Sequence, residues 1–156
     1  MSHIHKDIDF TAEVFVVFKN RVLLRKHDKY AIWLGVGGHI ELNEDPNEAA
    51  VREVKEEVGL DVTLVGPVSP QGINGDQELI APFFMNRHRP GGDPNHEHVA
   101  LIYFALTENE TITPENPTDE WHWFTVDELK MNDYGIMSNI LFYAEQALKK
   151  LSSPIV

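Results

Sequence analysis

Cysteine is absent from the 156-residue chain, which excludes disulfide bonds, thiolate metal ligands and cysteine nucleophiles. Long apolar runs are absent as well: the longest, at residues 99–106, suits a strand but is far short of the roughly 20 residues that span a membrane. The first ten residues mix charged and apolar side chains and lack the apolar stretch of a signal peptide. These absences predict a soluble, cytoplasmic protein.

Positive charge is also scarce in this sequence. The chain has 13 lysine and arginine residues against 25 aspartate and glutamate residues, a formal net charge of −12 with histidine neutral. Such a surface repels nucleic-acid phosphates and anionic lipid headgroups, so the composition favours neither nucleic acid nor a membrane as partner. With 42% hydrophobic and 24% charged residues, the chain is typical of a globular protein, and we expect one domain over residues 1–156.

Apolar periodicity and turn residues predict the order of the elements. Residues 10–18 and 22–25 form a predicted hairpin, in which Asn20 can adopt the positive φ of the turn. Further strands are predicted at residues 62–65, 79–85, 99–106 and 121–124, with loops at residues 87–95 and 109–118. Helical spacing of apolar residues predicts a closing helix over residues 134–151. This order predicts an α/β fold with a mixed sheet and helices packed on it.

The strongest helix signal covers residues 46–58. Asp45 is a suitable N-cap, Pro46 suits the first helical position, and Glu48 can complete a capping box with Asp45. Gly59 can adopt the left-handed conformation that ends a helix. The stripe that we expect to face the core consists of Ala50, Val51, Val54 and Val58.

An adjoining arc of the same helix carries Glu53, Glu56 and Glu57. Like charges at these spacings repel one another by a few tenths of a kcal/mol per pair, and a cation would relieve that repulsion. Oxygen ligands without cysteine favour a hard divalent ion, Mg²⁺ or Mn²⁺. A solvated acidic helix face is the alternative interpretation.

A longer pattern surrounds this helix. From Gly38 the chain continues with five residues, Glu44, seven residues, and then Arg52-Glu53-Val54-Lys55-Glu56-Glu57-Val58-Gly59-Leu60. Residues 38–60 resemble the Nudix box, Gly-x5-Glu-x7-Arg-Glu-U-x-Glu-Glu-x-Gly-U with U aliphatic, at every fixed position. One departure lies upstream, where many members have proline before the glycine pair and this chain has Val36.

Similarity to the Nudix, or MutT-like, hydrolases implies an α/β/α sandwich with a mixed β-sheet between helices and the box as a loop–helix–loop. It also implies Mg²⁺- or Mn²⁺-dependent hydrolysis of a nucleoside diphosphate linked to another moiety, such as a nucleoside triphosphate or a modified one. The partner would be a small nucleotide substrate. Many members are dimers, so the resemblance also allows a homodimer.

The resemblance further implies roles for individual residues. The metal ligands would be the backbone carbonyl of Gly37 and the carboxylates of Glu53, Glu56 and Glu57. Arg52 would orient a carboxylate, and Glu44 would support the loop or a water at the metal. Glu56 or Glu57 could act as the base. In MutT-like members, however, a loop glutamate ahead of a Glu-Trp strand start contributes to this chemistry, which points to Glu115.

Several candidates outside the box remain open. Glu97 is the next candidate for a carboxylate outside the helix. Phosphate contacts are predicted for Arg25, Arg87 and Arg89, although a solvated loop is the alternative for the last two. His96 and His98 share one face of a strand start and could bind zinc, although a polar strand edge or a hydrogen bond to substrate is more common.

Competing functions follow from the same family resemblance. A Nudix domain that senses a nucleotide without cleaving it tends to lose box carboxylates, and this chain keeps them. Hydrolysis of ADP-ribose or a nucleotide sugar remains an alternative, because the signals after the box do not identify the substrate. RNA processing is disfavoured by the net charge of −12.

Overall fold

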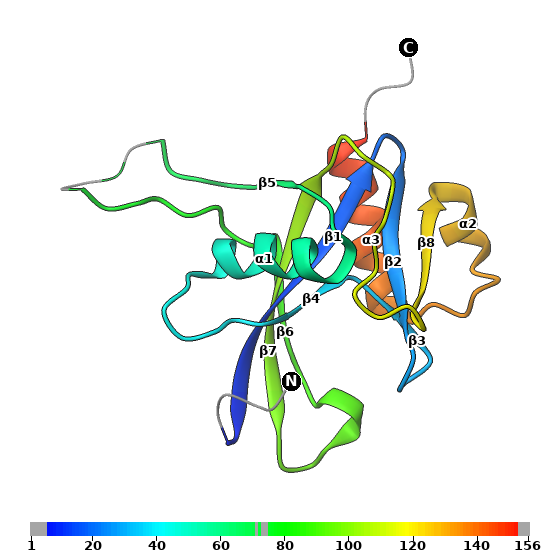
Figure 1. Ribbon diagram of the computed structural model, residues 1–156, viewed down its shortest axis with the longest axis horizontal. Coiled ribbons are helices and arrows are strands. Elements are labelled where there is room, and N and C mark those ends of the chain that lie inside the picture. Colours follow the sequence, from blue (N-terminus) through cyan, green and yellow to red (C-terminus); the bar gives the residue numbers. More distant parts are fainter. Residues whose placement is uncertain (1–5, 71, 73–74, 153–156) are drawn as a thin grey trace.

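The computed structural model describes residues 6–70, 72 and 75–152. In the described residues, an eight-stranded mixed sheet forms the centre of the molecule, and helices cover both of its faces (Figure 1). The elements are β1 (Ile8–Phe18), β2 (Arg21–His27), β3 (Ile32–Leu34), β4 (Val36–His39), α1 (Pro46–Val58), β5 (Thr63–Val65), β6 (Phe84–His88), a short 3₁₀ turn (Pro90–Gly92), β7 (Glu97–Leu106), β8 (Glu120–Thr125), α2 (Val126–Met131) and α3 (Ser138–Leu151). None of the helices within these residues is both long and apolar enough to cross a membrane.

The parallel pair β1–β7 lies in the middle of the sheet. It runs in register from Ile8 opposite Glu97 to Val17 opposite Leu106, and every other strand pair of the described residues is antiparallel. The strand order is β3-β2-β1-β7-β5, and β4, β6 and β8 pair with β1, β7 and β2 respectively. The mixed sheet confirms the predicted α/β class.

Side chains of β1 alternate between two hydrophobic cores, one on each face of the sheet. Phe15 and Val17 belong to the core that includes α2 and α3. Val14 and Val16 belong to the core that includes α1. A strand that is apolar on both faces must be covered on both faces, which is the physical reason for the α/β/α layering.

Helix α1 begins and ends where the sequence predicts. Asp45 accepts from the backbone N of Asn47 and Glu48, Glu48 completes the capping box, and Gly59 has φ 72°. The predicted buried stripe is wrong in one member, because Val51 is 40% exposed. Glu53 is buried instead, at 4% exposure, so the face of α1 that meets the sheet is rotated toward the carboxylates.

Other boundaries also differ from the predictions. The positive φ of the β1–β2 turn falls on Lys19, not on Asn20. The predicted strand at residues 79–85 forms only at Phe84–His88, and Ile80 instead exchanges two hydrogen bonds with the side chain of Asn47 on α1, at 2.8 and 2.9 Å. That side chain satisfies the backbone groups that a strand neighbour would otherwise satisfy. The closing helix starts at Ser138 rather than at residue 134.

Candidate functional site

Two glycines of β4 determine how closely β1 and α1 approach that strand. A Cβ atom at Gly37 would lie 2.0 Å from the backbone oxygen of Ala12 on β1. A Cβ atom at Gly38 would lie 2.6 Å from a carboxylate oxygen of Glu53 on α1. The absence of side chains at these positions lets the Glu53 carboxylate lie directly against the strand, which explains its burial.

Arg52 connects three carboxylates beside these glycines. Its Nε and Nη2 donate to the two oxygens of Glu44 at 2.9 and 2.7 Å, and its Nη1 donates to Glu53 at 2.9 Å and to Glu56 at 3.0 Å. Its Nη2 also donates to the backbone oxygen of His39 at 3.0 Å. The guanidinium holds the pKa of Glu44 below its usual range. Arg52 therefore joins the loop before α1, the end of β4 and the helix in one polar network.

Glu57 faces the same space one helical turn after Glu53. Its carboxylate accepts from the backbone N of Gly37 at 3.2 Å and from Nη1 of Arg25 at 2.5 Å. Nε of Arg25 lies 2.7 Å from the carboxylate of Asp119, whose side chain is 2% exposed. Burial raises the pKa of Glu57 to about 7 although Arg25 lowers it, and burial also raises the pKa of Glu53. The negative charge of these two carboxylates is therefore only partly compensated by the described side chains.

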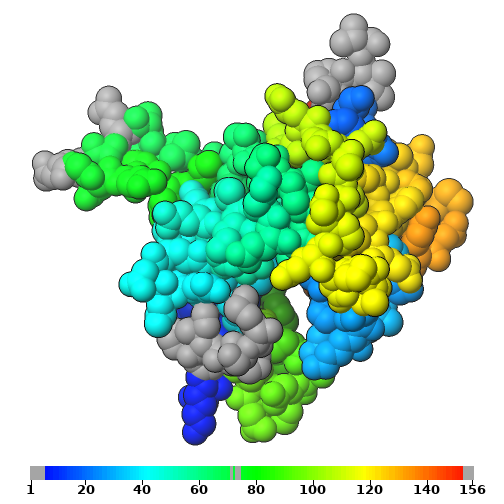
Figure 2. Space-filling view, in the orientation of Figure 1, coloured from blue at the N-terminus to red at the C-terminus, as the bar shows by residue number. Residues whose placement is uncertain are grey.

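A cleft of about 840 Å³ opens beside these carboxylates. Figure 2 shows the hollow between the teal of α1, the yellow of the loop that precedes β8 and the blue of β2 and β3. Its acidic lining residues are Glu13, Glu41, Glu53, Glu56, Glu57 and Glu115. Its apolar and amide lining side chains include Ile32, Leu34, Met137, Ile140, Asn86 and Asn139. The cleft thus combines a strongly acidic part with a part that suits a flat, weakly polar group.

The structure brings most of the predicted site residues together. The cleft and the polar network beside it contain Arg25, Gly37, Glu44, Arg52, Glu53, Glu56, Glu57, Arg89 and Glu115. Glu115 is exposed, and its backbone N donates to the backbone oxygen of Glu57 at 2.9 Å, which holds its loop against α1. Arg87 instead pairs with Glu97 on the surface, and it is not among the described residues that line the cleft.

Some acidic residues of the site, among them Glu13 and Asp119, were not predicted from the sequence. Glu13 lines the cleft from β1 and accepts from the backbone N of Gly35 at 2.9 Å, and burial raises its pKa to about 6. The sequence feature that could have indicated Glu13 is a charged residue in the middle of an apolar strand. Asp119 is buried beside Arg25, and the sequence gives no comparable signal for it, because it lies in a polar loop.

Comparison with known proteins agrees with this geometry. The model of the NUDIX domain family matches residues 10–144. The chain belongs to the Nudix family. A solved Nudix hydrolase from Clostridium perfringens is 38% identical to it, with a TM-score of 0.80, and the match covers 92% of this chain and 98% of that one.

Two other similar proteins have names that specify different substrates. An RNA pyrophosphohydrolase from Gluconacetobacter diazotrophicus is 24% identical over 127 residues, which are 79% of this chain and 74% of that protein. An ADP-ribose pyrophosphatase from Streptococcus suis shares the fold at 16% identity and a TM-score of 0.57, with 94% of each chain covered. The comparisons thus identify this Nudix chain as a hydrolase without specifying its substrate.

Nudix hydrolases use a divalent metal ion, and the residues of this Nudix chain fit one. The carboxylates of Glu53, Glu56 and Glu57 on α1 offer only oxygen donors, which suit Mg²⁺ and Mn²⁺. Burial raises the pKa of Glu53 and Glu57, so a nearby cation would stabilise their charged forms. Glu56 is about half exposed and can reach toward the cleft.

Proposed function

We propose that this Nudix hydrolase is a Mg²⁺- or Mn²⁺-dependent pyrophosphohydrolase that cleaves a nucleoside diphosphate linked to another moiety. The supporting observation is the convergence of Glu53, Glu56 and Glu57 on a cleft that also has an apolar part. An acidic group of this kind would repel a diphosphate unless a divalent cation lay between them.

In this proposal the metal is held by Glu53, Glu56, Glu57 and the backbone carbonyl of Gly37. When bound, the metal supplies positive charge to the phosphoryl oxygens and lowers the pKa of water. Arg52 holds Glu53 and Glu56 in place through its Nη1. This preorganisation means that the carboxylates need not reorient as the reaction proceeds.

Glu115 is the proposed base in this reaction. It lines the cleft from a loop, so its carboxylate can accept a proton from the attacking water while the box carboxylates hold the metal. Its backbone hydrogen bond to Glu57 fixes the distance between the loop and α1. Glu97 is a weaker candidate, because its carboxylate pairs with Arg87 and Arg89.

The proposed substrate is a small nucleotide. The amides of Asn86 and Asn139 can hydrogen-bond to a base, and the apolar side chains of Leu34 and Ile140 can contact its faces. Arg89 lines the cleft and lies 3.7 Å from Glu97, whereas Arg25 is held more closely by both Glu57 and Asp119, so Arg89 is the better placed of the two for a phosphate. The net charge of −12 favours a small nucleotide over the end of an RNA chain.

A substrate panel tests this proposal. The purified chain with Mg²⁺ would be incubated with nucleoside triphosphates, nucleotide sugars, ADP-ribose and 5′-triphosphorylated RNA, and the products identified by mass. We expect cleavage of a phosphoric anhydride bond in at least one small nucleotide. Tight nucleotide binding with no turnover would favour the sensing alternative, and turnover of RNA alone would overturn the substrate assignment.

A further inference from the structure

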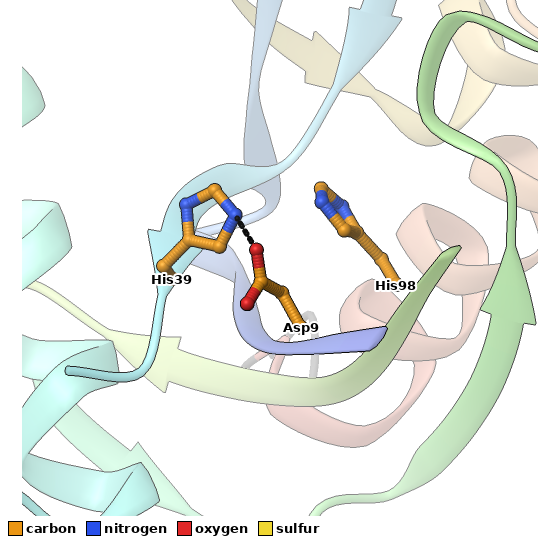
Figure 3. A group of neighbouring side chains, drawn as sticks. All are labelled: Asp9, His39 and His98. Atoms are coloured by element: carbon orange, nitrogen blue, oxygen red, sulfur yellow. Dashed lines mark ion pairs between the residues drawn. The ribbon is translucent and has the colours of Figure 1, made fainter. Parts of the chain in front are cut away.

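A second group of potential metal ligands lies at the edge of the same cleft, on three neighbouring strands. Asp9 of β1 is directly opposite His98 of β7, and Thr11 of β1 is directly opposite His39 of β4. Side chains two residues apart on a strand share a face, so Asp9, His39 and His98 converge. Figure 3 shows the two imidazole rings on either side of the Asp9 carboxylate. One potential ligand atom from each residue lies within 4.8 Å of the others.

The carboxylate of Asp9 is held in a fixed place. Its Oδ2 lies 3.1 Å from Nε2 of His39 and 3.2 Å from Nε2 of His96. Nδ1 of His96 lies 3.1 Å from the backbone oxygen of Lys6, so the ring is held between Lys6 and Asp9. His96 therefore lies behind Asp9, in the position of the outer partners that orient metal ligands.

We propose that Asp9, His39 and His98 form a binding site for a borderline divalent metal ion, of which Zn²⁺ is the representative, separate from the carboxylates of α1. Two imidazole nitrogens and one carboxylate oxygen suit Zn²⁺ and similar transition metals, whereas Mg²⁺ prefers oxygen ligands throughout. The two sites of the cleft would therefore select different ions by the chemistry of their donors.

The distances are compatible with such an ion. Ligand atoms about 2.1 Å from a tetrahedral Zn²⁺ lie roughly 3.4 Å from one another. Asp9 Oδ2 and His39 Nε2 are already at 3.1 Å, so rotation of the partly exposed His98 ring completes the set.

The remaining coordination position would face the cleft. His39 and His98 are among the residues that line the cleft, whereas Asp9 is 1% exposed and lies beneath them. Three protein ligands leave a fourth tetrahedral position for water or for an atom of the bound molecule. The backbone oxygen of His39 also accepts from Arg52, so an ion on His39 would stabilise the end of β4 that Arg52 contacts.

Zinc binding in the presence of excess Mg²⁺ tests the proposal without reference to hydrolysis. The full chain would be treated with EDTA, dialysed, supplied with millimolar Mg²⁺ to occupy the box carboxylates, and titrated with Zn²⁺ by calorimetry. We expect one Zn²⁺ per chain, and Co²⁺ in its place should give the visible bands of a nitrogen-ligated, low-coordinate ion. H98Q and D9N should each weaken zinc binding by at least ~10-fold.

Two control variants separate this site from its surroundings. H88Q removes the ring of His88, which lies 5.5 Å from the ring of His98 and whose Nδ1 is 2.7 Å from Oδ1 of Asn86. This variant should bind Zn²⁺ as the wild type does. E56Q should also keep zinc binding, even if hydrolysis is lost. Absence of zinc binding, equal binding by H98Q, or loss of binding in E56Q or H88Q would each overturn the proposal. Should D9N fail to fold, H98Q decides the outcome, because His98 lies at the cleft rather than in the core.

Discussion

Three glutamates within five residues of α1 occupy three different environments. The side chains of Glu53, Glu57 and Glu56 are 5%, 15% and 53% exposed, respectively. Glu53 and Glu57 therefore experience the desolvation that raises a carboxylate pKa, whereas Glu56 is held mainly by Arg52. The same substitution should thus have different effects on stability at each of these positions, even where its effect on activity is similar.

Glu56→Gln should lower kcat by at least ~10²-fold while leaving the fold intact, because it removes a proposed metal ligand from a half-exposed position. The melting temperature should change little, since the substitution relieves like-charge repulsion on the helix but also removes the exposed ion pair with Arg52. Steady-state kinetics and calorimetry measure both effects. The matched control is Glu145→Gln on the exposed face of α3, which should change neither. Normal turnover of Glu56→Gln would instead show that the acidic face is a solvated surface without a role in hydrolysis.

Glu115→Gln should lower kcat by ~10²–10⁴-fold with little change in KM, as expected for loss of a general base. If Glu115 only assists the metal, additional Mg²⁺ should restore part of the activity. Glu97→Gln is the comparison, because Glu97 forms its ion pairs with Arg87 and Arg89. If Glu115→Gln has wild-type kinetics and Glu97→Gln loses its activity, Glu97 rather than Glu115 is the general base.

Glu13 should make stability depend on pH in a defined direction. Burial raises its pKa to about 6 from 4.5, so the folded chain binds this proton more tightly than the unfolded chain does. The resulting stabilisation is complete at low pH and is lost as the pH rises through 6. Glu13→Gln keeps an acceptor for Gly35 and removes the titration, so its stability relative to wild type should increase by about 2 kcal/mol between pH 4.5 and 7. Denaturant unfolding in EDTA measures this difference, and a constant difference across the range would contradict the assignment.

At the scale of the elements, β4 is the part of the site that tolerates least change. It lies between β1, to which it is hydrogen-bonded, and α1, and glycine occupies the two positions at which these neighbours come closest. At Gly37 the neighbour is backbone, which cannot move without separating two strands. At Gly38 the neighbour is the carboxylate of Glu53, which can move aside but then leaves the place it occupies in the site.

Substitution of these adjacent glycines should therefore separate stability from activity. Gly37→Ala would place Cβ against the Ala12 carbonyl and should destabilise the protein by at least ~2 kcal/mol. Gly38→Ala should remain folded but displace the Glu53 carboxylate, with a loss of activity and of Mg²⁺ affinity. Thermal unfolding and kinetics on both variants test this contrast. Equal destabilisation of the two would show that Glu53 is as rigid as the backbone.

The elements also show which features the sequence can predict. α1 was predicted with both of its ends because its cap, its capping box and its terminal glycine are all local signals. β4 was not predicted as a strand, because its two central glycines carry no apolar alternation and the approach of β1 and α1 that requires them is not local. The strand predicted at residues 79–85 begins only at Phe84, and a non-local contact is again involved, since the backbone of Ile80 is bonded by Asn47 from a distant helix.

The candidate site divides in the same way. The box residues Arg52, Glu53, Glu56 and Glu57 share one helix, so their spacing alone predicted that they would lie together. Asp9 and His39 were not predicted as a pair, because their proximity depends on the register between β1 and β4. His96 and His98 were noted as neighbours, but only the structure distinguishes the ring that faces the cleft from the ring behind Asp9.

At the scale of the whole molecule, the charge distribution links stability to cations. The chain carries a formal charge of −12, and part of it is concentrated in one cleft. A cation that binds the folded chain but not the unfolded one stabilises the fold in proportion to the logarithm of its concentration.

Mg²⁺ should accordingly raise the melting temperature, and EDTA should abolish turnover. At a concentration about 100 times its dissociation constant, the ion should add about 2.7 kcal/mol of stability. Calorimetry across a Mg²⁺ series measures the shift, and Glu57→Gln should reduce it by removing one of the proposed ligands. Full turnover in metal-free buffer would contradict the assignment of a metal-dependent hydrolase.

The parallel pairing of β1 with β7 has a consequence for how the chain folds. Paired residues of the two strands, such as Ile8 and Glu97, are 89 positions apart in the sequence, so the central ladder closes only after most of the chain is available, and such long-range pairing slows folding. Until then β1 can form only its hairpin with β2 and its local pairing with β4, with apolar side chains on both faces. During synthesis the first strand of the protein therefore remains prone to aggregation until β7 has emerged from the ribosome.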